Sequence, residues 1–306
     1  MAFSASEAAM EGFRIARREP ATIAIWCVLQ LILGVAVTVV TFPYMRPLMA
    51  LEALSASGTT SLTPAAAMAA LEPMLGLTAV MIPIELVLVS VLGAAVYRAV
   101  LRPEDKGLGR LRLGGDELRL GILWIELGLF VWAAGILALI VLVILASGLV
   151  AATKGSPANV LALVMMAYLI VAAGMAWLAV RLSLAAPMTF ATRQVRLFSA
   201  WRLTKDCFWP LFGCYLLTFI FMIMIGFAQL FMGYLAALAI SGGSIVQAAS
   251  SYSHADYSSL QAYLTPVRVV ALLINALLGG VYWSVALAPA AVAYKEMVGP
   301  GARASA

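Results

Sequence analysis

The sequence predicts an all-α integral membrane protein with six transmembrane helices, arranged as three hairpins with cytoplasmic amphipathic lead-in helices. Three observations predict this fold class. Hydrophobic residues make up 64% of the 306-residue chain and charged residues only 11%, whereas soluble domains carry about 25% charged residues. A water-soluble fold of this length could not bury so much apolar side chain. The apolar runs are long and lack period-2 alternation, which argues against a transmembrane β-barrel.

Six stretches reach the length of about 20 mostly apolar residues that a spanning helix needs. The third and fifth exceed a perpendicular span, so tilt or interfacial extensions are expected there. The first is longer than a signal-peptide core and follows a polar-rich segment, so it is not expected to be a cleavable signal. The whole chain, 1–306, is expected to form a single membrane domain. The predicted spans are 21–43, 74–97, 120–149, 159–181, 207–240 and 267–294.

Arginine and lysine set the predicted orientation, because they are enriched in cytoplasmic loops. Of the 19 such residues, 16 lie in 1–20, 98–119, 181–206 and the tail after the sixth span. The remaining three lie in the opposite loops, at Arg46, Lys154 and Arg268. Both termini are therefore expected in the cytoplasm, with the chain in a bacterial inner membrane.

A short pattern precedes each outward-going helix. Arg14, Arg119 and Arg202 each follow an aromatic residue or leucine and precede isoleucine or leucine. The pattern predicts an internal repeat of three hairpins, each introduced by an amphipathic segment. In such a segment the apolar residue and the arginine stem lie at the acyl boundary, and the guanidinium reaches lipid phosphate.

The stretch "AWRLTKDCFWPLF" (200–212) concentrates candidate interfacial residues. Trp209 is expected at headgroup depth, where aromatic residues gather. Two interpretations of these residues stay open: a general interfacial anchor, or a specific site for anionic lipid headgroups or for a membrane-protein partner, including a second copy of the chain. The candidate contact residues are Arg14, Arg119, Arg181, Trp201, Arg202, Lys205 and Trp209.

The stretch "RLSLAAPMTFATRQVRLFSAWRLTKDCFWPLFGCYLL" (181–217) resembles the multi-span membrane domain that accompanies some bacterial glycerophosphoryl diester phosphodiesterases. The segment 97–121 is similar to one in stand-alone membrane proteins of this type from alphaproteobacteria. The phosphodiesterase activity of that family lies in a separate soluble barrel with a metal site, for which this chain has no room. The resemblance therefore implies a membrane module without the enzyme activity. The residues that fit are Arg181, Leu182, Leu184, Pro187, Trp201, Arg202, Leu203, Thr204 and Lys205.

Two glutamates lie inside predicted spans, where an ionisable side chain is costly and usually faces the bundle interior. From the rise of a helix, Glu85 lies roughly 18 Å from the cytoplasmic end of its span and Glu126 about 9 Å. The two are not level, so a shared two-carboxylate site is not expected. Each is interpreted either as a structural polar contact or as a group that binds a proton, ion or ligand. Candidate partners of Glu126 are Arg119, Arg98 and Arg181.

The sixth span contains polar and small residues. Asn275 is expected to make an interhelical hydrogen bond, with Glu85 as a candidate partner. Gly280, Ser284 and Ala288 form a ridge of small residues that predicts close helix packing. The mixed-charge segment "LRPEDKGLGRLRLGGDELRLG" (101–121) is expected to be a folded cytoplasmic loop at the lipid surface.

Catalysis needs a nucleophile with a base in reach, or a metal with its ligands. The chain has one histidine and three cysteines, and no GxSxG, HExxH, P-loop or dinucleotide motif. No cofactor, metal or nucleic-acid partner is expected.

Three functions remain open. The first is a non-catalytic membrane protein that binds lipid or acts as accessory or scaffold in a membrane complex. The second is a small transporter or channel that uses Glu85, which would need a polar cavity reaching Glu85. The third is an intramembrane lipid-modifying enzyme, with Glu85 or Glu126 facing a lipid-accessible cleft. A scaffold would have Glu85 sealed by packing.

Overall fold

The computed structural model describes residues 4–56, 64–152, 157–253 and 255–299, and every regular element in these ranges is a helix. Six of the described helices are long and apolar enough to cross a membrane. The predicted all-α membrane fold with six transmembrane helices is therefore confirmed. These helices are α2 (Pro20–Ala56), α3 (Pro64–Leu101), α4 (Gly115–Ala152), α5 (Pro157–Leu182), α8 (Phe208–Ile240) and α11 (Pro266–Val298).

Short helices fill the connections. The first hairpin is preceded by an amphipathic helix, and the third by two short helices. In front of α4 there is instead a loop with one 3₁₀ turn, and the predicted lead-in residues Leu118 to Leu120 belong to α4 itself. The lead-in pattern therefore marks separate helices at two of the three hairpins. The short elements are α1 (Ala5–Arg18), η1 (Leu108–Arg110), α6 (Ala185–Thr192), α7 (Ser199–Leu203), α9 (Ile245–Ser253) and α10 (Leu260–Tyr263).

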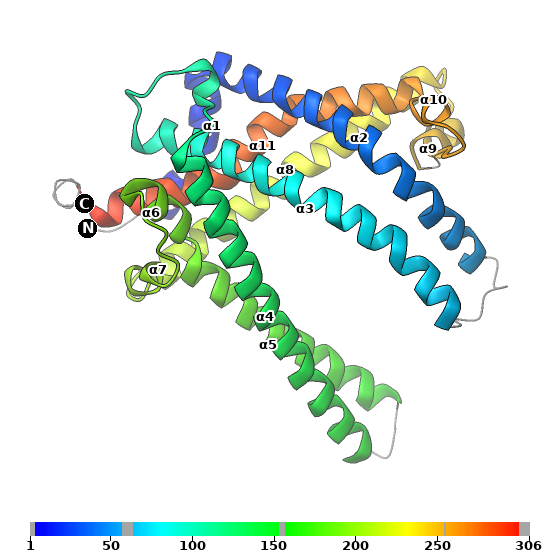
Figure 1. The fold of residues 1–306 in the computed structure, drawn as a ribbon, viewed down its shortest axis with the longest axis horizontal. Coiled ribbons are helices and arrows are strands. Elements are labelled where there is room, and N and C mark those ends of the chain that lie inside the picture. Colours follow the sequence, from blue (N-terminus) through cyan, green and yellow to red (C-terminus); the bar gives the residue numbers. More distant parts are fainter. Residues whose placement is uncertain (1–3, 57–63, 153–156, 254, 300–306) are drawn as a thin grey trace.

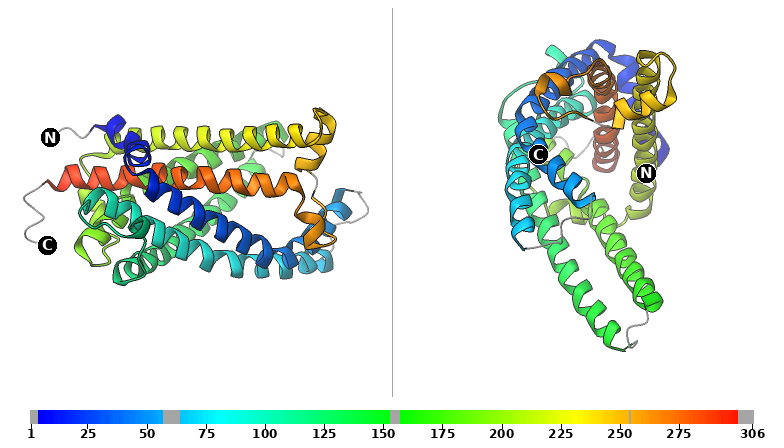
Figure 2. Two further views of the ribbon diagram at one scale, coloured as in Figure 1. Left: turned by 90° about the horizontal axis from the view of Figure 1, so that it is seen from above. Right: turned by 90° about the vertical axis from the view of Figure 1, so that its right-hand side faces the viewer.

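The three hairpins converge at the end of the bundle where both termini lie, called the terminal end below, and diverge away from it (Figures 1 and 2). Helix α11 packs against both α2 and α8. The α4–α5 hairpin leaves the other four long helices at a wide angle (Figure 1). The core lies at the terminal end, because side chains from all three hairpins meet there. Its largest fully buried members include Trp26, Tyr97, Phe190, Leu92 and Leu211.

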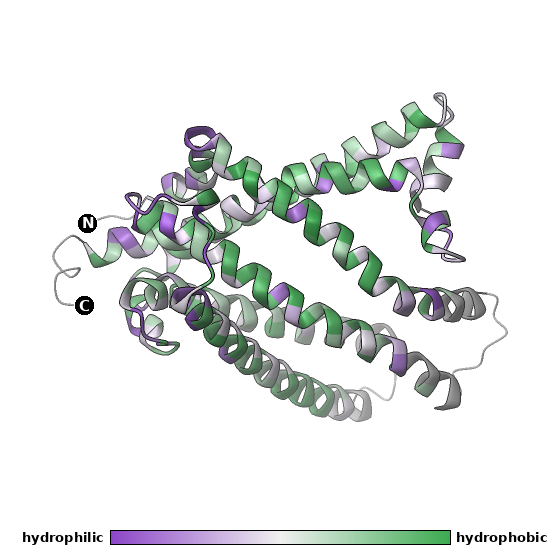
Figure 3. Ribbon diagram, turned by 45° about the horizontal axis from the view of Figure 1, so that its top comes forward, coloured by the Kyte–Doolittle hydropathy of each residue, from purple (hydrophilic) through white to green (hydrophobic). Residues whose placement is uncertain are grey.

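Away from the terminal end the long helices expose apolar side chains. Leu137 and Ile144 on α4 are each 63% exposed, and no residue in the most apolar part of α4 is buried. Figure 3 shows this hydrophobic surface along the long helices, with hydrophilic residues gathered around the terminal end and in the connection between α8 and α11 at the opposite end. Lipid tails are as apolar as leucine, so such surfaces carry no penalty in a bilayer.

Helix α1 packs across α11 and α8. Its buried face consists of Ala8, Ala9, Gly12 and Ile15. A Cβ on Gly12 would lie 2.6 Å from the carbonyl oxygen of Ser284, so only glycine permits this crossing. The apolar face of α1 is therefore covered by protein, while Arg14 is exposed on the other side of the helix.

The ridge of small residues on α11 packs as the sequence predicts. Gly280, Ser284 and Ala288 are all buried. A Cβ on Gly280 would lie 2.9 Å from the Sγ of Cys27, whose thiol donates a hydrogen bond to the carbonyl of Leu277 at 3.2 Å. The ridge thus brings α2 and α11 into close contact.

Candidate functional site

A connected network of charged side chains holds the terminal end together, and we call it the polar hub. Its ion pairs connect four segments: the start of α2, the end of α3, the loop after α3 and the start of α4. Its members are Glu19, Arg98, Arg102, Asp105, Arg110, Asp116 and Glu117.

Arg98 and Glu117 form the most buried ion pair of the hub, with side chains 3% and 6% exposed. The Nη1 of Arg98 also donates to the carbonyl of Arg110 at 2.9 Å. Glu117 accepts a further hydrogen bond from the backbone N–H of Gly114 at 2.9 Å. Buried pairs are stable only when such additional hydrogen bonds satisfy the remaining polar atoms. This pair therefore fixes α4 against α3.

Arg110 anchors the loop to the start of α2. Its Nε and Nη2 donate to the carboxylate of Glu19 at 2.9 and 2.7 Å. These hydrogen bonds lower the pKa of the Glu19 carboxyl below its ordinary value. The remaining N–H groups of Arg110 donate to carbonyls of the loop itself, including those of Asp105 and Pro103.

Further contacts tie the hub to the rest of the terminal end. Arg102 pairs with Asp116 at 3.1 Å, donates to the carbonyl of Phe190 on α6, and lies over the Phe190 ring at 4.6 Å. Trp26 donates its indole N–H to the carbonyl of Gly109 at 2.7 Å. The loop is thus folded, as expected, and it is integrated into the packed end of the bundle.

Beside the hub lies a cationic pocket of about 340 Å³ at the start of α4. Four arginines line it, and three of them pair with Glu117, Asp116 and the neighbouring Asp105, which leaves the pocket with an excess positive charge. Arg112 and Arg119 are partly exposed and pair with Asp105 and Asp116. Arg193 is exposed in the left-handed backbone conformation, and it forms no ion pair with any residue that the structure describes. The lining residues are Arg98, Arg112, Leu113, Gly114, Gly115, Asp116, Glu117, Arg119 and Arg193.

An apolar groove of about 320 Å³ runs between α3 and α4 next to this pocket. Leu113, Gly114 and Glu117 line both spaces, so the groove and the cationic pocket adjoin. We call the two together the α3–α4 site. The other groove residues are Leu86, Val87, Ser90, Val91, Leu118, Gly121, Ile122 and Ile125.

The α3–α4 site is amphiphilic. Arginine binds phosphate through several N–H donors at once, and an apolar groove binds hydrocarbon. A ligand with a phosphate group and an acyl chain matches both halves. Among the described residues no group of three or more histidine, cysteine or acidic side chains forms a metal site.

The structure separates the predicted site residues into several places. Arg119 lies in the α3–α4 site. Arg181 and Trp201 lie together at a different place, between α5 and α7. The remaining interfacial candidates are all exposed: Arg14, Arg202, Lys205 and Trp209.

The intramembrane candidates lie apart from these residues. Glu85, Glu126 and Asn275 are exposed on α3, α4 and α11, and none of them lines the α3–α4 site. None forms an ion pair or side-chain hydrogen bond with another described residue, so the expected interhelical contact of Asn275 is not found there.

Two of the candidate partners of Glu126 are engaged elsewhere. Arg98 pairs with Glu117, and Arg119 pairs with Asp116. The third, Arg181, stacks on aromatic rings. The structure contradicts these three pairings: Glu117 and Asp116 at the start of α4 pair with Arg98 and Arg119 instead, and Arg181 lies among aromatic rings rather than beside Glu126.

Sequence reasoning also missed two contributors to the α3–α4 site. Arg112 lies in the loop after α3, and Arg193 directly follows α6. Only the tertiary fold brings these two side chains to the same pocket. The available signal was the segment 107–115, which alternates glycine, leucine and arginine.

Fold and site together define a multi-pass all-α membrane protein with an amphiphilic site at its terminal end. Comparison of the chain with protein-family models, with curated proteins and with solved structures gives no match.

Proposed function

We propose that this chain is a non-catalytic protein of a bacterial inner membrane, with both termini in the cytoplasm, that binds an anionic phospholipid in the α3–α4 site. It would act as a membrane module of the kind that the segment 181–217 resembles, alone or as an accessory subunit of a membrane complex.

The observation that carries this proposal is the junction of the cationic pocket with the apolar groove. A phospholipid headgroup and its acyl chain are joined in the same way, with the charge at the membrane surface and the hydrocarbon below it. Arg193 supplies a cation that has no carboxylate partner among the described residues, and Arg112 and Arg119 are partly exposed beside it. The strong bias of arginine and lysine to the terminal end supports placing this end at the anionic cytoplasmic leaflet.

The test is lipid binding by the purified chain in mild detergent, measured by native mass spectrometry with added phosphatidylglycerol or phosphatidylcholine. The double variant Arg119→Gln/Arg193→Gln should bind phosphatidylglycerol at least about tenfold more weakly, because each charged hydrogen bond contributes roughly 1.5–3 kcal/mol. Arg17→Gln is the matched control, since Arg17 is exposed at the terminal end outside the site. Unchanged binding by the double variant, or equal binding of the two lipids by the native chain, would contradict the proposal.

The same purification separates the accessory role from independent lipid binding. A protein that co-elutes from native membranes in fixed stoichiometry would assign the chain to a complex. A transport role for Glu85 gains no support from the α3–α4 site, which Glu85 does not line.

A further inference from the structure

The guanidinium of Arg181, at the end of α5, lies among three aromatic rings. Its Cζ is 5.5 Å from the ring centre of Trp177, 5.8 Å from that of Trp201 and 5.7 Å from that of Phe208. These rings come from α5, α7 and α8, and we call them the aromatic box. Trp177 and Trp201 also contact each other edge to face at 5.0 Å. The side chain is therefore held in place by three separate elements.

Arg181 lacks a counter-ion among the described residues. Its Nε and Nη1 are buried and have no hydrogen-bond partner in the described part of the chain, and Nη2 does not share this burial. Aromatic faces attract a cation, but they do not replace the hydrogen bonds that the guanidinium loses on leaving water. A partly buried charge without an anion is costly in free energy. An anion bound at the Nη2 side of Arg181 would reduce this cost.

The surroundings place Arg181 at the level of lipid headgroups. It lies at the terminal end, and exposed aromatic side chains occur near it at Trp177, Phe198 and Trp209, as is typical of a membrane–water interface. The hydroxyl of Thr204 donates to the carbonyl of Arg181 at 3.1 Å, which holds α7 against the end of α5.

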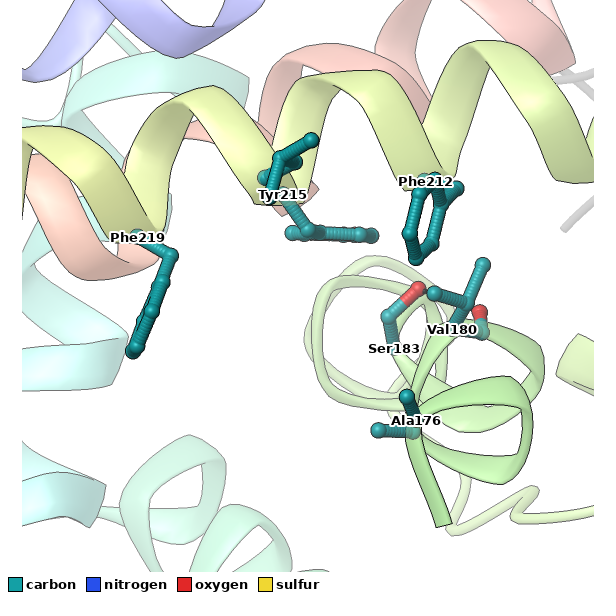
Figure 4. A pocket seen from close by; sticks show the side chains of 8 residues that line it. Ala176, Val180, Ser183, Phe212, Tyr215 and Phe219 are labelled. Atoms are coloured by element: carbon teal, nitrogen blue, oxygen red, sulfur yellow. Dashed lines mark hydrogen bonds between the residues drawn. The ribbon is translucent and has the colours of Figure 1, made fainter. Parts of the chain in front are cut away.

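An apolar pocket of about 380 Å³ lies between α5 and α8, close to the aromatic box. In Figure 4, Phe212, Tyr215 and Phe219 of α8 face Ala176 and Val180 of α5, and Ser183 directly after α5, across it. Phe212 also stacks on Phe208 of the box, with ring centres 6.0 Å apart. The stacked rings of Phe208 and Phe212 thus connect the guanidinium of Arg181 with the apolar pocket, which can hold hydrocarbon.

We propose that Arg181 binds the phosphate of a second glycerophospholipid, one acyl chain of which occupies the α5–α8 pocket. The charge of Arg181 selects the phosphate, and the apolar lining of the adjacent pocket selects a lipid over free phosphate. The inference rests on the proposed lipid binding for the nature of the ligand. It concerns different residues from those of the α3–α4 site, so each site can fail alone.

Two variants test the two halves of this site in the native mass spectrometry experiment with phosphatidylglycerol. Arg181→Gln removes the charge, and Ala176→Phe fills the pocket from α5 while leaving Arg181 in place. Arg181→Gln should weaken the binding of one lipid about tenfold or more. Ala176→Phe should weaken the same lipid, because the acyl chain loses its space, and inorganic phosphate at equal concentration should not displace that lipid. Ala133→Phe is the matched control, because Ala133 is exposed on α4 and lines neither the α5–α8 pocket nor the α3–α4 site. Thermal unfolding of lipid-free samples verifies that Ala176→Phe still folds.

The outcomes at the two sites are distinguishable. Loss of one lipid in Arg181→Gln and Ala176→Phe, and of another in Arg119→Gln/Arg193→Gln, supports both sites. Full lipid binding by the first two variants, or displacement of the lipid by inorganic phosphate, overturns the inference and leaves the α3–α4 site standing. Loss only in the first two variants supports the inference and contradicts the α3–α4 site.

Discussion

At the scale of single residues, the arginines of the terminal end differ in how their charge is compensated. Arg98 and Arg110 are almost fully buried and are matched by the carboxylates of Glu117 and Glu19. Arg181 is surrounded by rings, and Arg193 is open to the surroundings. The first two arginines therefore stabilise the fold, and the last two are available to a ligand.

The buried Arg98–Glu117 pair should be costly to break. Glu117→Gln removes the closest carboxylate of the buried Arg98 and leaves only Asp105, which lies 4.0 Å away and also pairs with Arg112. This loss should lower the free energy of unfolding by about 3 kcal/mol. The double variant Arg98→Met/Glu117→Leu should recover a large part of this loss, because two apolar side chains need no counter-ion. Unfolding by titration with a denaturing detergent measures both. Equal losses in the single and the double variant would contradict this account.

The Glu19–Arg110 pair should make stability depend on pH. Because the pKa of Glu19 is lowered in the folded state, the stabilisation is complete above the ordinary carboxyl pKa of 4.5. It is lost as the pH falls through the lower folded value. Glu19→Gln should be less stable than the native chain at pH 7 and should lose less stability on acidification. Parallel acid dependence of the two chains, in thermal unfolding followed by circular dichroism, would show that Glu19 does not contribute.

At the scale of elements, the crossing of α1 over α11 depends on Gly12. A side chain there would meet the backbone of Ser284 and Val285, and backbone cannot move aside as a flexible side chain does. Gly12→Ala should therefore destabilise the protein by about 1–3 kcal/mol. Gly128→Ala is the control, because nothing lies within 4 Å of its added Cβ and helix propensity favours alanine. A loss of thermal stability in the control as large as that in Gly12→Ala would contradict the steric explanation.

The long helices could be predicted from sequence, but their polar connections could not. Uninterrupted apolar runs define spanning helices by length alone, so α2, α8 and α11 were found nearly to the residue at one end or both. The loop after α3 depends on pairs such as Glu19 with Arg110, which lie 91 residues apart. The charged residues of the loop are evident from its composition, but their partners are not. The pocket beside the loop could therefore not be predicted.

At the scale of the whole molecule, the α4–α5 hairpin is joined to the rest mainly at the terminal end, since α5 makes few contacts with α8. The distance between the α4–α5 hairpin and the other long helices should therefore vary in a bilayer. Spin labels at Val141 on α4 and Leu235 on α8, with the three native cysteines replaced by alanine, should give a broad distance distribution. Labels at Glu104 and Lys205, both exposed at the terminal end, should give a narrow one. Equally narrow distributions would contradict this picture.

The packing of α1 on α11 has a consequence for biosynthesis. Helix α1 ends at Arg18 and α11 begins at Pro266, so α1 leaves the ribosome roughly 10 to 50 s before its partner at a translation rate of about 5–20 residues per second. During that interval the bilayer surface is the available place for its apolar face. Docking of α1 can therefore be completed only after the chain has been synthesised through α11, because α8 provides only part of its contact surface. A chain interrupted earlier leaves the part of this face that α11 covers without a protein partner.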